Sequence, residues 1–244
     1  MVKIIVSGIA GRMGMRIGAL GAADKDIEVA GALEAKDHAS VGKDIGNVLS
    51  VKNIGKSVAD DLEKIKDSPC VLIEFTSAPV TMAHLQIATK KKIGMVIGTT
   101  AISHQEIEKI KDASKKIPIV FSPNMSIGAN LLFRLTEEAS RSLGKDYSVE
   151  IIEAHHNKKK DAPSGTAKRL GEAVSSVRGK EPPIKSIREG DIVGDHVVIF
   201  KNKNETIELK HVAHSRDTFA QGALDAAKFL AGKKSGLYTM QDVI

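Results

Sequence analysis

The sequence predicts an α/β protein in which a doubly wound parallel sheet is followed by a second, α+β domain with a mixed or antiparallel sheet. In the first half of the chain, short apolar runs alternate with helical patterns, which is typical of a parallel sheet covered by helices. A glycine-rich turn follows the first apolar run, and two later strand-like runs are joined by the short polar segment 201–204, which indicates a hairpin.

The first half contains five strand-like runs. Strands are predicted at residues 3–7, 27–33, 71–75, 95–98 and 117–121, and helices at 12–23, 79–91 and 103–116. The last of these helices opens with Ser103 and Glu106, which have the spacing of a capping box. Residues 35–66 are rich in Gly, Lys and Asp and show no clear periodicity.

The pattern changes after Asn124. Helices are predicted at about 129–143, 165–177 and 218–230, and strands at 148–154, 195–200 and 206–212. The last helix is amphipathic, and we expect it to return to the first domain. We therefore predict a dinucleotide-binding domain at residues 1–126, completed by 216–244, and a substrate-binding and oligomerisation domain at 127–215.

Composition and charge favour anionic small molecules as ligands. The formal net charge is +6, but the chain has no Trp and only 3% aromatic residues, so stacking on nucleic acid is poorly supported. No apolar run reaches the roughly 18 residues that a membrane span requires, and no signal peptide is recognisable, so we expect a cytoplasmic protein. One cysteine, Cys70, cannot form an internal disulfide or a multi-cysteine zinc site.

The turn after the first strand predicts a dinucleotide site of the Rossmann type. It is a G-x-x-G-x-x-G variant of the dinucleotide fingerprint, and it reads Gly8, Ile9, Ala10, Gly11, Arg12, Met13, Gly14. The helix that follows offers free N–H groups and its positive dipole end to a pyrophosphate. A purely structural strand-to-helix turn would look similar. Glu34, at the end of the second strand, can accept hydrogen bonds from the adenosine ribose, although it could also be a solvated surface residue.

Two further strand ends carry small or hydrogen-bonding residues. One loop consists of Gly98, Thr99 and Thr100, and the other of Ser122, Pro123, Asn124 and Met125. Ligands bind at the carboxyl ends of strands in open α/β sheets, so we predict that both loops contact the cofactor. Either could be an ordinary loop.

The run from Glu153 to Thr166 is the densest functional signal. Strand alternation places Glu153 and His155 on one face and His156 on the other, unless the strand breaks after His155. Gly165 and Thr166 begin a helix whose N–H groups form a carboxylate site, and Lys159 can supply a positive charge or a proton. A structural histidine pair beside a solvated lysine loop is the simpler alternative. A zinc site is disfavoured because adjacent histidines on a strand have poor ligand geometry, so no metal is predicted.

The segment E-A-H-H-N-K-K-K-D-A-P-S-G-T-A, residues 153–167, resembles the signature of the 4-hydroxy-tetrahydrodipicolinate reductases. The glycine turn, Glu34, both loops and Ser215-Arg216 follow in that family's order, so the resemblance spans nearly the whole chain. It implies an oxidoreductase of lysine and diaminopimelate biosynthesis that uses NADH or NADPH, acts on a small dianionic heterocyclic substrate and forms a homotetramer.

The resemblance also implies residue roles. His155 would be a proton donor or acceptor and Lys159 a proton donor, while His156, Gly165 and Thr166 would bind substrate. Ala35 and Lys36 stand where family members that favour the 2′-phosphate often place Arg, which leaves the preference between the two cofactors open. Two alternative functions remain: a reductase that acts on another small acid, and a non-catalytic NAD(P)H sensor.

Overall fold

The computed structural model describes residues 1–66 and 70–244, and these residues divide into two compact units. The first unit comprises Met1–Met125 and Phe219–Val243, and the second comprises Ser126–Thr218 together with Ile244. Among the described residues, no helix combines the length and the apolar character that crossing a membrane would need.

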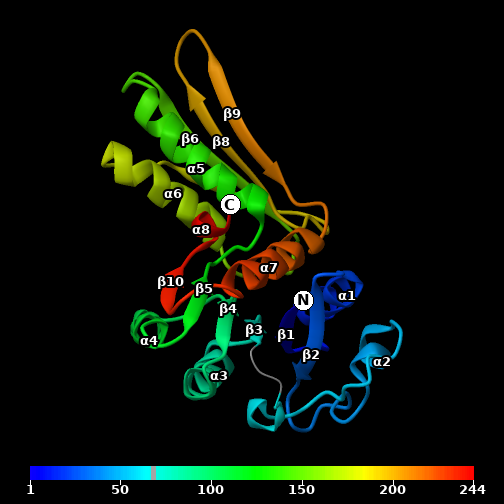
Figure 1. Ribbon diagram of the computed structural model, residues 1–244. Helices are drawn as coiled ribbons and strands as arrows, with labels where there is room; N and C mark the ends of the chain where they lie inside the picture. The colour runs from blue at the N-terminus through cyan, green and yellow to red at the C-terminus, as the bar shows by residue number, and fades with distance from the viewer. Residues whose placement is uncertain (67–69) are drawn as a thin grey trace. The chain divides into compact units, whose positions relative to one another are not determined.

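The first unit is built on a six-stranded parallel sheet (Figure 1). Its strands are β1 (Val2–Ser7), β2 (Ile27–Leu33), β3 (Val71–Glu74), β4 (Gly94–Ile97), β5 (Pro118–Phe121) and β10 (Gly236–Tyr238). Their order across the sheet is β10-β5-β4-β3-β1-β2, and every neighbouring pair is parallel. The chain order reverses between β1 and β3, which is the switch point of a doubly wound fold. The predicted Rossmann-type sheet is confirmed.

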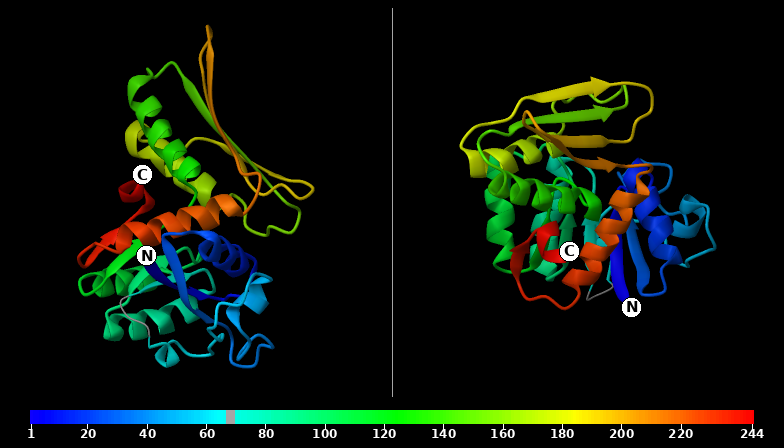
Figure 2. Two further views of the ribbon diagram at one scale, coloured as in Figure 1. Left: turned by 45° about the vertical axis from the view of Figure 1, so that its right-hand side comes forward. Right: turned by 90° about the horizontal axis from the view of Figure 1, so that it is seen from above.

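Helices cover both faces of this sheet, as the two views of Figure 2 also show. The helices and the 3-10 turn of this unit are α1 (Arg12–Ala23), α2 (Ile45–Leu49), η1 (Leu62–Lys64), α3 (Ala78–Lys91), α4 (His104–Ser114), α7 (Asp217–Leu230) and α8 (Met240–Val243). One core packs Ile17 of α1 and Leu224 of α7 against the sheet, and the other packs Leu85 of α3 and Ile110 of α4. Because successive strand residues face opposite ways, strands buried on both faces are apolar throughout.

The second unit is a four-stranded mixed sheet with two helices. Its elements are α5 (Ile127–Ser142), β6 (Ser148–His155), α6 (Gly165–Arg178), β7 (Ile184–Arg188), β8 (Asp195–Lys201) and β9 (Thr206–Val212). The strand order is β7-β6-β8-β9, in which β6 and β7 are parallel and the other pairs antiparallel. Both helices pack on the same face, where Phe133 and Leu170 contact Ile151, Val198 and Phe200 (Figures 1 and 2).

Most predicted elements are confirmed to within two residues of their ends, including the β8–β9 hairpin and the capping box of Ser103 and Glu106. Five elements were not predicted: α2, η1, β7, β10 and α8. Helix α2 and the turn η1 are short and lie within residues 35–66, where the sequence shows no clear periodicity. In β7 the apolar residues Ile184 and Ile187 are three apart, so the strand lacks the alternation that identifies strands in sequence. Strand β10 and helix α8 have three and four residues, too few for a periodic signal, and β10 exists through its pairing with β5.

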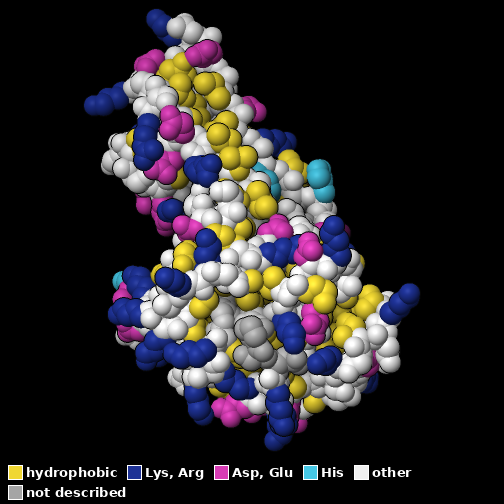
Figure 3. Space-filling view, viewed as in Figure 1, with side chains coloured by type: hydrophobic (Ala, Val, Ile, Leu, Met, Phe, Trp, Pro, Cys, Tyr) yellow, Lys and Arg dark blue, Asp and Glu magenta, His cyan; other side chains and the backbone are white. Residues whose placement is uncertain are grey.

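Charged side chains are spread over the surface. Figure 3 shows Lys and Arg side chains across the visible face of the first unit, with Asp and Glu side chains between them.

Candidate active site

The predicted cofactor residues of the first unit meet at one edge of the parallel sheet. Cross-strand register aligns Ser7 with Leu33 on one side and with Glu74 on the other, and the row continues through Ile97 to Phe121. These are the last residues of five neighbouring strands. The residues after four of them are Gly8, Glu34, Gly98 and Ser122, so the glycine turn, Glu34 and the loops at 98–100 and 122–125 share that edge.

The glycine turn has the backbone that a dinucleotide turn requires. Gly8 has a φ of +67°, and its N–H donates to the carbonyl of Leu33 at 2.9 Å. A Cβ on Gly14 would lie 2.0 Å from the carbonyl oxygen of Gly8, so only glycine allows the helix to start this close to the strand. Gly11 is the N-cap of α1 and provides no side-chain cap. The helix therefore begins with backbone N–H groups that a pyrophosphate can occupy.

Glu34 lies against this turn. One of its carboxylate oxygens accepts a hydrogen bond from the N–H of Ala10 at 3.0 Å, and the other accepts one from the N–H of Ala35 at the same distance. Its position beside the fingerprint is where a ribose-binding acid is expected. Ile9 is fully buried, Met13 partly packs against the core, and Arg12 is exposed at the start of α1.

The two outer loops differ in burial. Thr99 is 3% exposed and accepts a hydrogen bond from the Thr81 hydroxyl at 2.8 Å, whereas Thr100 is exposed. The hydroxyl of Ser122 donates to the carbonyl of Asn124 at 2.8 Å and closes that loop, in which Pro123 is exposed and Met125 is buried. Gly98 packs against the ring of Phe75, because a Cβ there would lie 2.3 Å from a ring atom.

Sequence reasoning missed a buried contact between a carboxyl group and a histidine at the same edge. Glu74 is fully buried at the end of β3, and its carboxylate lies 2.7 Å from Nδ1 of His84 on α3 and accepts a hydrogen bond from the hydroxyl of Thr76. An acidic residue at the end of an otherwise apolar strand was the available signal. A buried carboxyl group requires hydrogen-bond partners, and a single sequence does not indicate that His84 is one of them.

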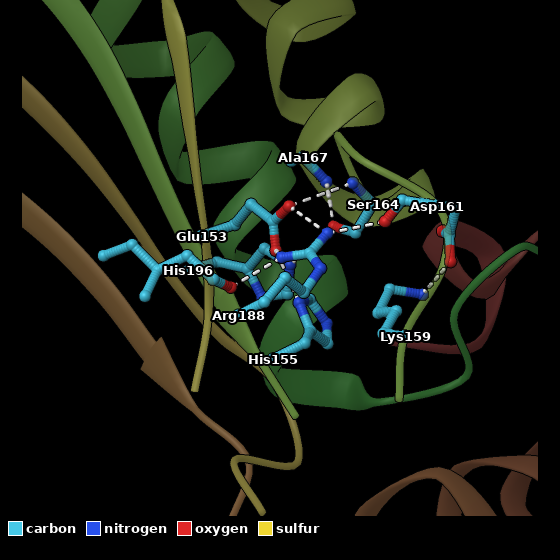
Figure 4. Close-up of polar contacts among 9 residues, drawn as sticks. Glu153, His155, Lys159, Asp161, Ser164, Ala167, Arg188 and His196 are labelled. Carbon is cyan, nitrogen blue, oxygen red and sulfur yellow. Dashed lines mark hydrogen bonds and ion pairs between the residues drawn. The ribbon is translucent and has the colours of Figure 1, made fainter. Parts of the chain in front are cut away.

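In the second unit, strand β6 presents Glu153 and His155 to the interior, as alternation predicts. Nδ1 of His155 lies 2.5 Å from Oε2 of Glu153, and Arg188 of β7 donates to both oxygens of Glu153, at 3.0 and 2.8 Å (Figure 4). The ring of His196 on β8 stands edge-on to that of His155, with 5.2 Å between ring centroids. Sequence reasoning missed both Arg188 and His196.

The N-terminus of α6 joins the same cluster. Ser164 is the N-cap, and its hydroxyl accepts a hydrogen bond from the N–H of Ala167 and lies 3.1 Å from Nε2 of His196. The N–H of Ser164 donates to Glu153 at 3.2 Å. Gly165 and Thr166 are the first helical residues, and the start of this helix contacts Glu153 through the N–H of Ser164. A carboxylate site at their N–H groups stays a prediction.

Lys159 and His156 lie in the loop that follows β6. The ammonium group of Lys159 is 2.8 Å from Asp161, and the side chain is 24% exposed (Figure 4). The strand ends at His155, so the break that sequence reasoning allowed is present. His156 donates its backbone N–H to Ile192, and its Nδ1 is buried with no hydrogen-bond partner among the described residues.

Burial and hydrogen bonding set the charges of this cluster. Burial alone would raise the pKa of Glu153, but hydrogen bonds led by that of Arg188 outweigh burial and lower this pKa to about 2. Burial lowers the pKa of His155, and Lys159 and Arg188 act in the same direction while Glu153 opposes them. Burial lowers the pKa of His196 to about 3. At neutral pH the cluster thus holds an ionised carboxylate and two neutral imidazoles.

Glu153, His155 and His196 also have ligand atoms within 4.8 Å of one another, which is close enough for a metal ion. His196 is distant in sequence from the paired histidines, so sequence reasoning could not include it. Both oxygens of Glu153 already bind the guanidinium of Arg188, and a second cation would be repelled by that charge. We therefore assign no metal to this cluster.

Comparisons with known proteins identify one and the same family in both halves of the chain. The family models described as dihydrodipicolinate reductase, N-terminus, and dihydrodipicolinate reductase, C-terminus, match residues 2–125 and 128–244. Two relatives named 4-hydroxy-tetrahydrodipicolinate reductase, from Trichlorobacter lovleyi and Desulfotalea psychrophila, are 40% and 41% identical, with all of this chain and 99% and 98% of theirs covered.

Solved structures show the same fold. A dipicolinate-bound dihydrodipicolinate reductase from Paenisporosarcina sp. TG-14 superposes over the full length of both chains with a TM-score of 0.82 at 22% identity. An amine dehydrogenase from Mycobacterium smegmatis superposes with a TM-score of 0.67 at 12% identity, covering 98% of this chain and 95% of that one.

Proposed function

The chain belongs to the dihydrodipicolinate reductase family, and on that premise we propose that it reduces 4-hydroxy-tetrahydrodipicolinate to tetrahydrodipicolinate with NADH or NADPH. The product is an intermediate of lysine and diaminopimelate biosynthesis, and we place the reaction in the cytoplasm. In the overall reaction the substrate loses water, and the resulting unsaturated imine gains a hydride at C4 and a proton at C3, while the nicotinamide is oxidised.

The observation that carries the proposal is the cluster of the second unit. It joins a proton-transfer histidine and the N-terminus of α6 in a buried hydrogen-bond network around Glu153. Lys159 lies beside this network, because its partner Asp161 also accepts a hydrogen bond from Arg188 (Figure 4). The substrate carries two carboxylates. The N–H groups of Gly165 and Thr166 and the positive charge of Lys159 are suited to bind such an anion.

In the first unit, the turn at Gly8–Gly14 suits a dinucleotide, because the uncapped start of α1 and the close approach at Gly14 leave backbone N–H groups for the pyrophosphate. We assign Glu34 to the adenosine ribose and the loops at 98–100 and 122–125 to the nicotinamide half. When bound, the reduced nicotinamide supplies the hydride.

The residues of the chain handle the proton and the substrate charge. We assign proton delivery to Lys159. Its ammonium group lies 2.8 Å from the carboxylate of Asp161, which holds it in place. His155 and His156 line the substrate, and an acid or base positioned in this way contributes on the order of a hundredfold to ten-thousandfold in rate.

Lys159→Ala tests these roles. Lys159 lies in a loop and pairs with the exposed Asp161, so the variant should fold and keep its affinity for cofactor, while kcat should fall by at least about a hundredfold. Lys158→Ala and Lys160→Ala are matched controls. Equal, modest losses in all three variants would mean that the loop acts only as a basic patch.

The activity itself is tested by following absorbance of the reduced nicotinamide after adding freshly generated 4-hydroxy-tetrahydrodipicolinate. Consumption of cofactor that depends on both substrate and protein is the expected result. Cofactor binding without consumption would instead favour a non-catalytic NAD(P)H sensor, and turnover only with another small acid would favour a different reductase.

We also propose that the second unit builds a homotetramer through the sheet face opposite α5 and α6. Ile152 and Val197 lie side by side at the centre of this face, and their cross-strand neighbours are Lys185 and Lys210. The adjacent row carries Glu150, Ile199 and Glu208. A two-fold axis can place the acidic row of one copy over the basic row of another, with the apolar centres in contact.

A further inference from the structure

Glu153 has a hydrogen-bond donor at every side of its carboxylate. Oε1 accepts from Arg188 Nη2 at 2.8 Å and from the backbone N–H of Ser164 at 3.2 Å. Oε2 accepts from Arg188 Nη1 at 3.0 Å and lies 2.5 Å from Nδ1 of His155. The side chain is fully buried, so each of these contacts is made away from water.

This arrangement determines which nitrogen of His155 carries the hydrogen. An ionised carboxylate can only accept hydrogen bonds, so the Nδ1 that faces it must be the donor. In the neutral ring Nε2 then has a lone pair and no hydrogen. A Cβ on Gly194 would lie 3.0 Å from this Nε2, so the glycine leaves the space beside Nε2 free of a side chain.

We propose that Glu153, clamped by Arg188, is a positioning residue that fixes His155 as the Nδ1–H tautomer and so presents Nε2 to the substrate as an acceptor. This inference rests on the proposed function. A ring with no hydrogen on Nε2 has no proton to donate there, so Lys159 is the proton donor and His155 accepts. Because Glu153 also binds the N–H of Ser164, one carboxylate sets both the histidine and the start of α6.

The charged and titratable groups around His155 come from four segments: Glu153 on β6, Arg188 on β7, His196 on β8 and Lys159 in the loop. Glu153→Gln removes the negative charge and leaves Arg188 unneutralised, which lowers the pKa of His155 further. Arg188→Met removes a positive charge and leaves Glu153 without its strongest partner, which raises the pKa of His155. The two variants therefore displace the protonation of His155 in opposite directions.

The pH profile of kcat/KM reports this difference, because its acid limb follows the protonation of groups in the free enzyme. Relative to the unmodified protein, the acid limb should move to lower pH in Glu153→Gln and to higher pH in Arg188→Met. Glu153→Gln should also lower kcat by on the order of tenfold to a hundredfold, since the amide can present its NH₂ to Nδ1 and reverse the tautomer. Glu172→Gln is the matched control, because it removes an exposed carboxylate that pairs with Arg169 in the same unit. It should leave the acid limb of the kcat/KM profile at the pH found for the unmodified protein.

Nitrogen-15 NMR of histidine-labelled protein without substrate tests the tautomer in the unmodified chain, with the His155 signals identified by their loss in His155→Asn. At neutral pH the expected signature is a protonated Nδ1 and an unprotonated Nε2. An Nε2–H tautomer, an imidazolium at neutral pH, or limb shifts in the same direction in both variants would overturn the inference. The NMR result does not depend on turnover, so it separates failure of this inference from failure of the proposed function.

Discussion

His196 offers a quantitative test, because it is a buried histidine held neutral by its surroundings. It is 3% exposed, and burial lowers its pKa to about 3 from an ordinary value near 6.5. The unfolded chain therefore binds a proton at His196 as the pH falls below about 6.5, while the folded protein does not. The contribution of His196 to the free energy of unfolding is therefore fully present above about pH 6.5, and it is lost progressively as the pH falls toward 3.

The size of the effect follows from the two pKa values. Between about pH 7.5 and pH 5, protonation of His196 in the unfolded state alone should remove about 2 kcal/mol from the free energy of unfolding. His155, whose pKa is also lowered by burial, adds to the loss in the same direction. Glu153 does not contribute in this window, because its lowered pKa matters only below about pH 4.5.

The assay is urea denaturation of the unmodified protein and of His196→Gln at both pH values. The variant should be less stable at pH 7.5, since the contact with Ser164 is perturbed, but its stability should fall by about 2 kcal/mol less on going to pH 5. His214→Gln, at an exposed histidine of the same unit, should show the full loss. An equal loss in His196→Gln and in the unmodified protein would refute the reasoning that burial keeps His196 neutral.

Three other predictions concern binding and assembly. Glu34→Ala should weaken the binding of NADH more than that of NADPH, because the 2′-phosphate of NADPH can still reach Lys36 or Arg12. If titrations show unchanged affinity for both cofactors, Glu34 does not bind the ribose. Gly165→Ala should fold normally because a Cβ there meets nothing within 4 Å, yet it should raise KM for the dicarboxylate, and an unchanged KM would place the carboxylate elsewhere. Light scattering should give the mass of a tetramer, and Val197→Glu on the uncovered sheet face should reduce it; a monomer at micromolar concentration would contradict the assembly.

Where local rules decide the structure, sequence reasoning was sufficient. Helix α1 runs from Arg12 to Ala23 and strand β2 from Ile27 to Leu33, as predicted, because the glycine turn and the apolar strand run are local signals. The strand–loop junctions at residues 8, 34, 98 and 122 could be placed on one edge because parallel strands end on the same side.

Sequence reasoning failed where contacts depend on strand pairing. Arg188 lies opposite His155 through the parallel β6–β7 register, and His196 lies opposite Glu153 through the antiparallel β6–β8 register. Neither register can be read from a single sequence, and β7 lacks the alternation that would have identified it. Glu153 was within the motif, but its role became clear only with Arg188 in place.

The most direct test of the proposed reduction uses NADPH carrying deuterium at the transferable position of C4 of its nicotinamide. The protein is mixed with freshly generated 4-hydroxy-tetrahydrodipicolinate, and the product is analysed by mass spectrometry and NMR. We expect tetrahydrodipicolinate with the cofactor's deuterium at C4 and a solvent-derived proton at C3, formed with an equal amount of NADP⁺. Deuterium that stays in the cofactor, or a product without deuterium at C4, would refute the proposed reduction.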